Sequence, residues 1–277
     1  MLRKKNITLN NSKATGDEKL KCGDTIKIFF SDETFEKFAA DNNRTANDDY
    51  YSRIYRPLDI IYENSDVIFI NKPSGMLSQK AKPEDVSLVE YLIAHLIHKG
   101  ELNAGDLASF KPGICNRLDR NTSGIVAAGK TTKGLQQLSE AFKQRILGKY
   151  YLCIVKGNVD KRALIKGYLY KDNKTNKVTI SRTETKDSLP IETEYIPVCS
   201  NGNVTLLKIH LLTGRSHQIR AHLASIGHPL IGDYKYGSQS VNDAFNRQYK
   251  EKDQMLHSYE LDIPDMDIHI YLSLIHI

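Results

Sequence analysis

Strand-like runs fill almost the whole stretch between residues 149 and 212. Each run is rich in Val, Ile, Leu, Tyr or Thr, and turn-forming or charged segments such as 171–177 and 200–203 separate them. The runs cover residues 149–157, 163–170, 177–182, 192–200 and 203–212. Because short connections join neighbouring strands in antiparallel order, this stretch predicts a mainly antiparallel β-sheet.

Helical patterns flank these strands. Residues 87–100 carry Leu at four-residue intervals, between a Ser that can cap the start of a helix and a Gly that can end it. Residues 131–145 and 214–227 also have an apolar face at helical spacing. Further strand candidates lie within 59–75 and at 125–129. The sequence therefore predicts an α+β fold, a mixed, mainly antiparallel sheet with flanking helices.

The chain divides into a small amino-terminal part and a large body. Its 277 residues, 40% of them apolar, suffice for one large domain and a small appendage. Residues 21–30 predict a short, half-buried strand that closes a first domain at 1–30. The polar, acidic segment 31–52 predicts a linker, and we expect the main domain over 53–271.

Net charge, hydropathy and cysteine spacing limit which partners, locations and metal sites can be expected. The formal net charge is +6 and the pI is near 8.9, which suits a polyanionic partner but equally suits an ordinary basic protein. No stretch approaches the roughly 20 apolar residues of a membrane span, and no export signal follows the charged start, so we expect a cytoplasmic protein without membrane contact. The four cysteines are far apart and form no CxxC pair, which argues against a zinc site and a disulfide framework.

The densest polar cluster in an apolar neighbourhood is the segment 116–124, NRLDRNTSG. Asp119 lies there between Arg117 and Arg120. Nearby guanidinium groups favour the ionised carboxylate, which suits a nucleophile or a base better than a general acid. Alternatively, Asp119 belongs to an Asx-turn and only accepts hydrogen bonds from nearby backbone N–H groups. Spacing alone leaves both interpretations open.

A second polar cluster, within residues 211–237, contains Arg215, His217, Arg220 and His222. The two histidines are five residues apart, well off a common helical face, so we expect no metal site there. Arg220 follows His217 by three residues, and both can face one cleft. Periodicity alone slightly favours a solvated basic helix face instead.

Tyr150 and Tyr151 stand near the start of the run 149–157. A tyrosine at this place is often half-buried packing, but its ring also offers a stacking face for an unstacked base. The sequence contains no phosphate-binding glycine loop, dinucleotide fingerprint or nucleophile elbow, so we expect no nucleotide cofactor.

Together these segments resemble the RluA family of RNA pseudouridine synthases, from about Leu58 to about Leu261. The resemblance rests on four motifs in the family's order: INKPSGM, NRLDRNTSGIVAAGK, KYYLCIVKG and LLTGRSHQIRAHLASIGHPLIGDYKYG. The latter three are long and specific. The resemblance implies the pseudouridine synthase fold, a monomer, and an enzyme that isomerises uridines in structured RNA without cofactor or metal.

The resemblance also implies roles for individual residues. Asp119 would be the catalytic aspartate, Tyr151 the active-site tyrosine, and Arg220 the arginine that ion-pairs with Asp119. Substrate-binding roles fall to residues of the same motifs, namely Lys72, Arg117, Arg215, His217 and Gln218. The family usually has histidine directly before Arg-Leu-Asp, whereas this chain has Asn116, which can hydrogen-bond but cannot titrate near neutral pH.

Both ends of the sequence carry expectations of their own. The amino-terminal segment resembles the latter half of the α-L RNA-binding domain, so residues 1–30 would form a partial RNA-binding domain in which Arg3, Lys4 and Lys5 contact phosphates. This fusion favours large-subunit ribosomal RNA over transfer RNA as the substrate. Leu272–Ile277 read LSLIHI, which a common sequencing adapter yields on translation, so we expect them not to be native.

Two other functions compete with this interpretation. A catalytically inactive RNA-binding or ribosome-assembly factor would need the same surface, but the intact set of Asp119, Tyr151 and Arg220 speaks against it. A glycosidase that stops at base removal would break the same bond, but the motifs contain no second acidic partner for Asp119.

Overall fold

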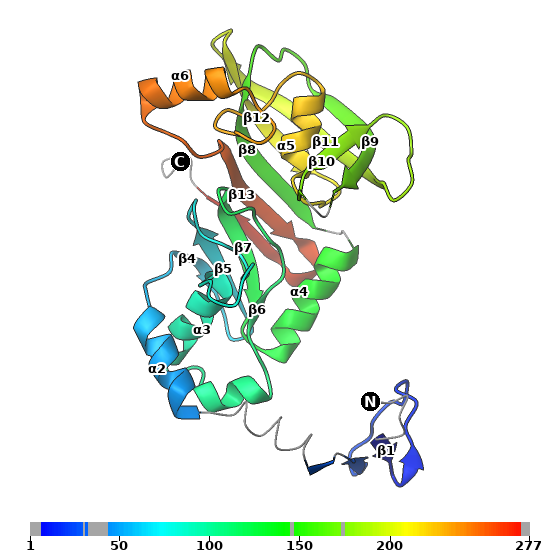
Figure 1. Ribbon diagram of the computed structural model, residues 1–277. Helices are drawn as coiled ribbons and strands as arrows, with labels where there is room; N and C mark the ends of the chain where they lie inside the picture. Colours follow the sequence, from blue (N-terminus) through cyan, green and yellow to red (C-terminus); the bar gives the residue numbers. More distant parts are fainter. Residues whose placement is uncertain (1–6, 30, 33–43, 145–146, 173–174, 273–277) are drawn as a thin grey trace. The chain divides into compact units, whose positions relative to one another are not determined.

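The computed structural model describes residues 7–29, 31–32, 44–144, 147–172 and 175–272, and Figure 1 shows the chain. Its contacts divide the chain into two compact units, Met1–Tyr50 and Tyr51–Ile277. Arg3, Lys4 and Lys5, and residues 273–277 of the suspected adapter segment, lie outside the described residues.

The first unit contains a small antiparallel sheet of three short strands, β1 (Ile7–Leu9), β2 (Ser12–Lys13) and β3 (Ile26–Ile28), in the order β2-β1-β3. The strand expected near residues 26–30 is therefore present. A half-buried strand would bury the face that carries Ile26 and Ile28, and that prediction was wrong. All three residues of β3 are exposed, Ile26 by 49% and Ile28 by 51%. Strands of two or three residues offer few apolar neighbours, so these side chains stay in contact with solvent.

A helix, α2 (Arg44–Ile54), begins inside the segment 31–52 that was predicted as a linker and ends two residues beyond it. The prediction missed it because the segment has no apolar stripe at helical spacing, which is the main helix signal in a sequence. A polar helix of this kind can still serve as a connection between domains.

The second unit is built on one sheet of eleven strands, in which a parallel pair, β7 with β13, lies among antiparallel neighbours. The path through the sheet is β10-β9-β11-β12-β8-β13-β7-β5-β4, with β6 added to β7 and β14 to β13. The strands are β4 (Ile60–Glu63), β5 (Val67–Lys72), β6 (Gly113–Ile114), β7 (Ser123–Gly129), β8 (Gly148–Lys156), β9 (Ala163–Lys171), β10 (Val178–Ser181), β11 (Leu189–Ser200), β12 (Val204–Leu211), β13 (Leu256–Ile263) and β14 (Ile268–Tyr271). The predicted α+β class, the mixed, mainly antiparallel sheet and the five successive strands are confirmed.

Helices cover both faces of this sheet (Figure 1). On one face, α3 (Leu88–His98) and α5 (Gln218–Ser225) pack on a core that includes Ile68 and Val126. On the other face, α4 (Thr132–Gln144) packs on a core that includes Phe69 and Ile125. Successive residues of β5 and β7 thus enter opposite cores, which explains why these strands read as continuous apolar runs.

The boundaries of α3 follow from its predicted capping residues. The Glu90 carboxylate accepts hydrogen bonds from the backbone N–H and the hydroxyl of Ser87, at 3.1 and 2.6 Å. Gly100 has φ +74°, a conformation that favours glycine and ends the helix. The remaining elements are α6 (Gln239–Tyr249) and the 3-10 turns η2 (Ala104–Ala108) and η3 (Pro264–Met266).

The contact between β7 and β13 depends on Gly124. Its φ is +110°, and a Cβ there would lie 2.1 Å from the carbonyl oxygen of Ser258, so a larger residue would push the two strands apart. Within the described residues, no helix combines the length and apolar character needed to cross a membrane.

Candidate active site

Asp119 lies in the loop between β6 and β7, near the middle of the sheet. The loop is held by its backbone: Ser78 Oγ donates to the carbonyl of Leu118 at 2.7 Å and accepts from its N–H at 3.0 Å, and the Thr122 N–H donates to the carbonyl of Asp119 at 3.0 Å. The side chain of Asp119 is 29% exposed. This backbone support lets the carboxylate point away from its own loop.

Lys72, at the end of β5, also binds the backbone of this loop. It is fully buried, and its Nζ donates to the carbonyl oxygens of Pro73, Met76 and Arg120 at 2.9, 2.9 and 3.1 Å. Burial lowers the pKa of Lys72 to about 8, against the opposing charge of Asp119. All three ammonium hydrogens are thus used inside the protein, which gives Lys72 a structural role, and its part in substrate binding stays a prediction.

Asn116, which stands where the family usually has histidine, also joins the loop to β7. Its Nδ2 donates to the carbonyl of Ile125 at 3.1 Å, and its Oδ1 accepts from the N–H of Ala127 at 2.8 Å. Both ends of the amide are thus used by the neighbouring backbone, which gives the side chain a structural role here.

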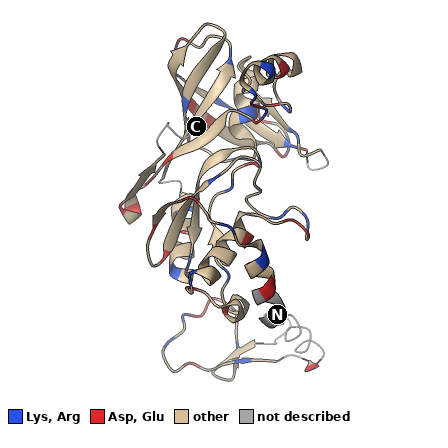
Figure 2. Cartoon of the chain, turned by 90° about the vertical axis from the view of Figure 1, so that its left-hand side faces the viewer, with Lys and Arg blue, Asp and Glu red and all other residues tan. Residues whose placement is uncertain are grey.

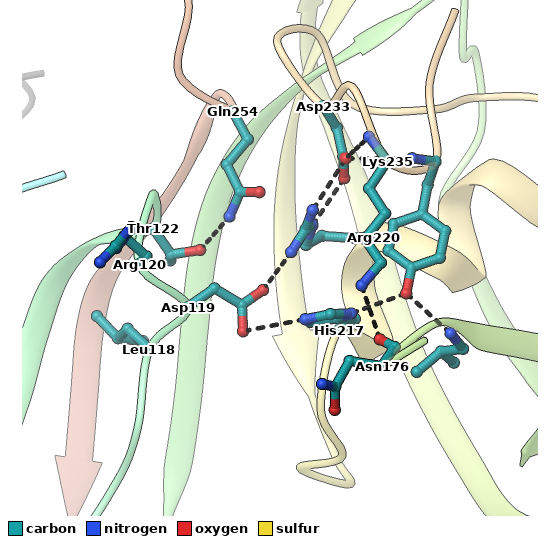
Figure 3. Close-up of polar contacts among 12 residues, drawn as sticks. Leu118, Asp119, Arg120, Thr122, Asn176, His217, Arg220, Asp233, Lys235 and Gln254 are labelled. Atoms are coloured by element: carbon teal, nitrogen blue, oxygen red, sulfur yellow. Dashed lines mark hydrogen bonds and ion pairs between the residues drawn. The ribbon is translucent and has the colours of Figure 1, made fainter. Parts of the chain in front are cut away.

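Arg220, on α5, connects two carboxylates (Figure 3). Its Nη1 donates to Asp119 Oδ2 at 2.7 Å, while Nε and Nη2 donate to the two carboxylate oxygens of Asp233 at 2.7 and 2.9 Å. Burial alone would lower the pKa of Arg220, but Asp233 and Asp119 together raise it above its ordinary value. Burial likewise opposes ionisation of Asp233, but the Arg220 guanidinium keeps its pKa below the usual range. The guanidinium is therefore a fixed cation aimed at Asp119.

These contacts decide between the alternatives that the sequence left open. Among the described residues, the side-chain partners of Asp119 are Arg220 and His217, and no backbone N–H donates to its carboxylate, so the Asx-turn interpretation was wrong. The interpretation of this helix as a solvated basic face was also wrong, because Arg220 is only 9% exposed and His222 only 2%.

His217 stands at the start of α5 and faces Asp119 from the other side. Its Nε2 lies 3.9 Å from Asp119 Oδ1, and its Nδ1 lies 2.7 Å from the hydroxyl oxygen of Tyr236. Its backbone is left-handed, with φ +54°. Burial lowers the pKa of His217 despite the nearby charge of Asp119.

Gln218 and Arg215, both predicted to bind substrate, differ in position. The amide of Gln218 is buried; it accepts from the Thr213 hydroxyl and the Arg215 N–H and donates to the Glu192 carbonyl and the Thr193 hydroxyl. These hydrogen bonds hold α5 on β11. Gln218 and the half-buried Arg215 both line the cavity beside Asp119, so substrate binding by either residue stays a prediction.

Tyr151 lies on β8, with its ring on the face of the sheet that carries α3 and α5. Burial raises the pKa of Tyr151 to about 12, and the charge of Asp119 adds to this effect. The phenol is thus neutral and unsuited to act as a base near neutral pH. Its neighbour Tyr150 belongs to the opposite face, where it stacks on His210 at a centroid distance of 4.6 Å.

A cavity of about 770 Å³ opens beside Asp119 and is also lined by Tyr151, His217 and Arg220. Basic side chains contribute to the same lining; they are Lys80, Arg117, Arg120, Lys143, Lys149 and Arg215. Figure 2 shows basic positions on many elements, with acidic positions among them. Arg117 and Arg120, the sequence neighbours of Asp119, are exposed and form no ion pair with it among the described residues.

Two residues of the site were missed in the sequence. Asp233 and Tyr236 belong to the motif GDYKYG, which was quoted as a whole without a role for either residue. Asp233 Oδ1 accepts from the N–H groups of Lys235 and Tyr236, as an aspartate in a turn commonly does. Nothing in the sequence indicated that the same carboxylate would hold Arg220.

The chain is similar to known proteins over most of its length. The family model described as RNA pseudouridylate synthase matches residues 66–225. An uncharacterized RNA pseudouridine synthase of Mycoplasma genitalium is 33% identical over 271 residues, which cover 96% of this chain and 80% of that protein. The ribosomal large subunit pseudouridine synthase D of Borreliella burgdorferi is 35% identical over 210 residues, which cover 75% of this chain and 61% of that protein.

Solved structures share the fold. Human RNA pseudouridylate synthase domain containing 4 matches with a TM-score of 0.63 at 18% identity, covering 87% of this chain and 93% of that one. Human RNA pseudouridylate synthase domain containing 1 matches with a TM-score of 0.61 at 23% identity, covering 78% and 83%. The expected resemblance is therefore confirmed, and the chain belongs to the RluA family of RNA pseudouridine synthases.

Proposed function

We propose that this RNA pseudouridine synthase modifies a uridine of large-subunit ribosomal RNA and uses Asp119 as its catalytic carboxylate. Relatives named for the large ribosomal subunit support that RNA over transfer RNA, which was the other candidate substrate. Action on ribosomal RNA would also agree with a cytoplasmic location, and we keep the monomeric state that the resemblance implies.

The observation that carries the proposal is the contact between Arg220 Nη1 and Asp119 Oδ2 at 2.7 Å, beside a cavity that Tyr151 also lines. A guanidinium in this position keeps the carboxylate charged and oriented. A charged carboxylate at a cavity wall can reach the sugar of a nucleotide that has been flipped out of its RNA, with the base stacked on Tyr151.

The proposed reaction breaks the bond between N1 of uracil and C1′ of ribose and forms a bond between C5 and C1′. The proton lost from C5 is balanced by the proton gained at N1, so substrate and product are isomers and no outside reductant or oxidant is required. Asp119 starts the reaction either by attack on C1′ or by removal of the proton on C2′. Both routes need the same ionised oxygen.

Binding of the remaining RNA would use the basic side chains around the cavity, among them Arg117 and Arg215. We propose that the first unit, as a partial α-L domain, adds further phosphate contacts. Affinity for RNA should then fall as salt concentration rises, because bound phosphates release counterions.

The decisive test is Asp119→Asn. The variant removes the charge but keeps the shape, so we expect turnover to fall by at least about a thousandfold while RNA affinity changes little. Turnover is measured as tritium release from ribosomal RNA labelled at C5 of uridine, and affinity by filter binding. Asp265→Asn, on the exposed turn η3, is the matched control and should keep full activity.

Each rival function gives a different result in this assay. Near-normal turnover by Asp119→Asn would remove Asp119 from the mechanism. Free uracil in the product would indicate a glycosidase. A wild-type protein that binds RNA but releases no tritium would indicate an inactive RNA-binding factor.

A further inference from the structure

The contacts of Tyr236 bear on which of the two ring nitrogens of His217 carries the hydrogen. Its hydroxyl oxygen lies 3.0 Å from the backbone N–H of Val178 and 2.7 Å from Nδ1 of His217. The Val178 N–H can only donate. The phenol therefore accepts from Val178, and its own hydrogen can be donated to Nδ1 of His217.

The other nitrogen of the ring is fixed by this contact. A neutral imidazole that accepts at Nδ1 carries its hydrogen on Nε2, and Nε2 is the atom that faces Asp119 Oδ1 at 3.9 Å. The charged groups around the ring are Asp119, Arg220, Asp233 and Lys235. With Oδ2 bound by the Arg220 cation, the two oxygens of Asp119 face different donors, one charged and one neutral.

The backbone of His217 points to the same function. A left-handed conformation at φ +54° is uncommon for a residue other than glycine, although histidine, like asparagine and aspartate, adopts it more often than most residues. Such conformations concentrate at functional sites. Here the conformation places the imidazole at the entrance to α5, between Tyr236 and Asp119.

We infer that His217 is a positioning residue for Asp119 and that Tyr236 sets its tautomer. In this arrangement, which rests on the proposed function of Asp119, the Nε2–H closes on Oδ1 when RNA binds and orients the carboxylate. Because one ring nitrogen accepts from Tyr236 and the other already carries a hydrogen, His217 does not act as the base that removes the uracil C5 proton. It supplies a neutral donor only.

The first experiment is Tyr236→Phe in the full chain, with Tyr234→Phe as the matched control. Tyr234 lies two residues away, is 48% exposed and donates its hydroxyl hydrogen to Asp243. We expect Tyr236→Phe to lower kcat roughly tenfold, since the His217 tautomer that donates to Asp119 is no longer held, while KM for RNA changes less than twofold. Tyr234→Phe should match the wild type.

Nitrogen-15 NMR of histidine-labelled protein reads the tautomer without any need for activity. The wild type should show Nδ1 as the unprotonated nitrogen of His217, and Tyr236→Phe should show a mixture of tautomers. A wild-type His217 protonated at Nδ1, or a Tyr236→Phe protein with wild-type kcat, would overturn the inference. An inactive wild type with the expected tautomer would instead contradict the proposed function alone.

A second pair of variants keeps the inference testable if Tyr236→Phe does not fold. The amide nitrogen of glutamine can reach the place of Nε2, whereas that of asparagine can only reach the place of Nδ1. His217→Gln should therefore stay within about fivefold of wild-type kcat, and His217→Asn should lose about tenfold although asparagine tolerates the left-handed backbone better. Equal kcat for His217→Asn and the wild type would refute the positioning role.

Discussion

The two sides of the active site are built by different kinds of contact. On the side of β5 to β7, Lys72, Ser78 and Asn116 bind backbone carbonyl and N–H groups of the loop and strand around Asp119. On the side of α5, Arg220 and Asp233 bind each other through their side chains. The side of β5 to β7 fixes the backbone of the loop that carries Asp119. The side of α5 fixes the cation that binds the Asp119 carboxylate.

Lys72 and Arg220 can be compared directly, because both are buried cations near Asp119 but belong to different sides of the site. The ammonium of Lys72 is a point charge with three donors, and it gathers three carbonyl oxygens from different directions. The guanidinium of Arg220 is a planar fork, and it binds one carboxylate with two nitrogens while the third reaches Asp119. Loss of Lys72 should therefore cost mainly stability, and loss of Arg220 mainly activity.

The largest effect is expected for Arg220→Lys. Lysine keeps the charge but cannot bind Asp233 and Asp119 together, so we expect kcat to fall about a thousandfold, or about 4 kcal/mol. Steady-state tritium release measures the effect. Arg162→Lys is the control, because the Arg162 side chain is 75% exposed, and it should keep the wild-type kcat. If Arg220→Lys kept wild-type kcat, the fork geometry would not matter.

Lys72→Met is expected to act on stability instead. Three carbonyl oxygens lose their donor, so the free energy of unfolding should fall by about 3 kcal/mol. Urea unfolding followed by circular dichroism measures this change. Lys133→Met provides the comparison, because its ion pair with Asp66 is exposed and should contribute less than about 1 kcal/mol. A larger loss of kcat in Lys72→Met than in Arg220→Lys would reverse the contrast between the two sides.

A smaller, pH-dependent effect is expected for His222, which lies on α5 and bonds to Thr193 at 3.0 Å. Burial lowers the pKa of His222 from 6.5 to about 4. Below pH 6.5 the unfolded chain takes up a proton that the folded chain refuses, so stability should fall as pH drops from 6.5 toward 4. At pH 5 this contribution is about 2 kcal/mol.

His222→Asn should therefore show a weaker loss of stability between pH 7 and pH 5 than the wild type. The difference between the two proteins isolates His222, because burial also lowers the pKa of His257 to about 4 in both. His269→Asn, at an exposed position, is the control. Parallel curves for His222→Asn and the wild type would mean that His222 is not held neutral.

The sequence predicted the sheet well because its strands carry local signals. β8 to β12 are separated by turn residues, and α3 is marked by Ser87 and Gly100. The helix α2 was missed because it lacks an apolar stripe, and Ile26 and Ile28 were placed inside because alternation does not show whether a second layer exists.

For the site, the resemblance indicated which residues matter but not how they are used. Lys72 and Gln218 belong to the motifs, yet both bond inside the protein, because a motif does not distinguish a residue that touches substrate from one that holds the loop. Asp233 was missed because it approaches Arg220 only in space. Roles for Asp119, Tyr151 and Arg220 in catalysis remain predictions. So do the substrate-binding roles of Lys72, Arg117, Arg215, His217 and Gln218.

The position of β13 has a consequence for synthesis of the protein. Residues 257 and 258 pair with residues 123 and 124, so the centre of the sheet is completed by a strand made more than a hundred residues later. Until that strand leaves the ribosome, β7 and β8 each keep an open edge in a nascent chain that already holds most of the apolar residues. Such edges invite wrong pairing, so folding during translation should depend on chaperone protection until β13 arrives.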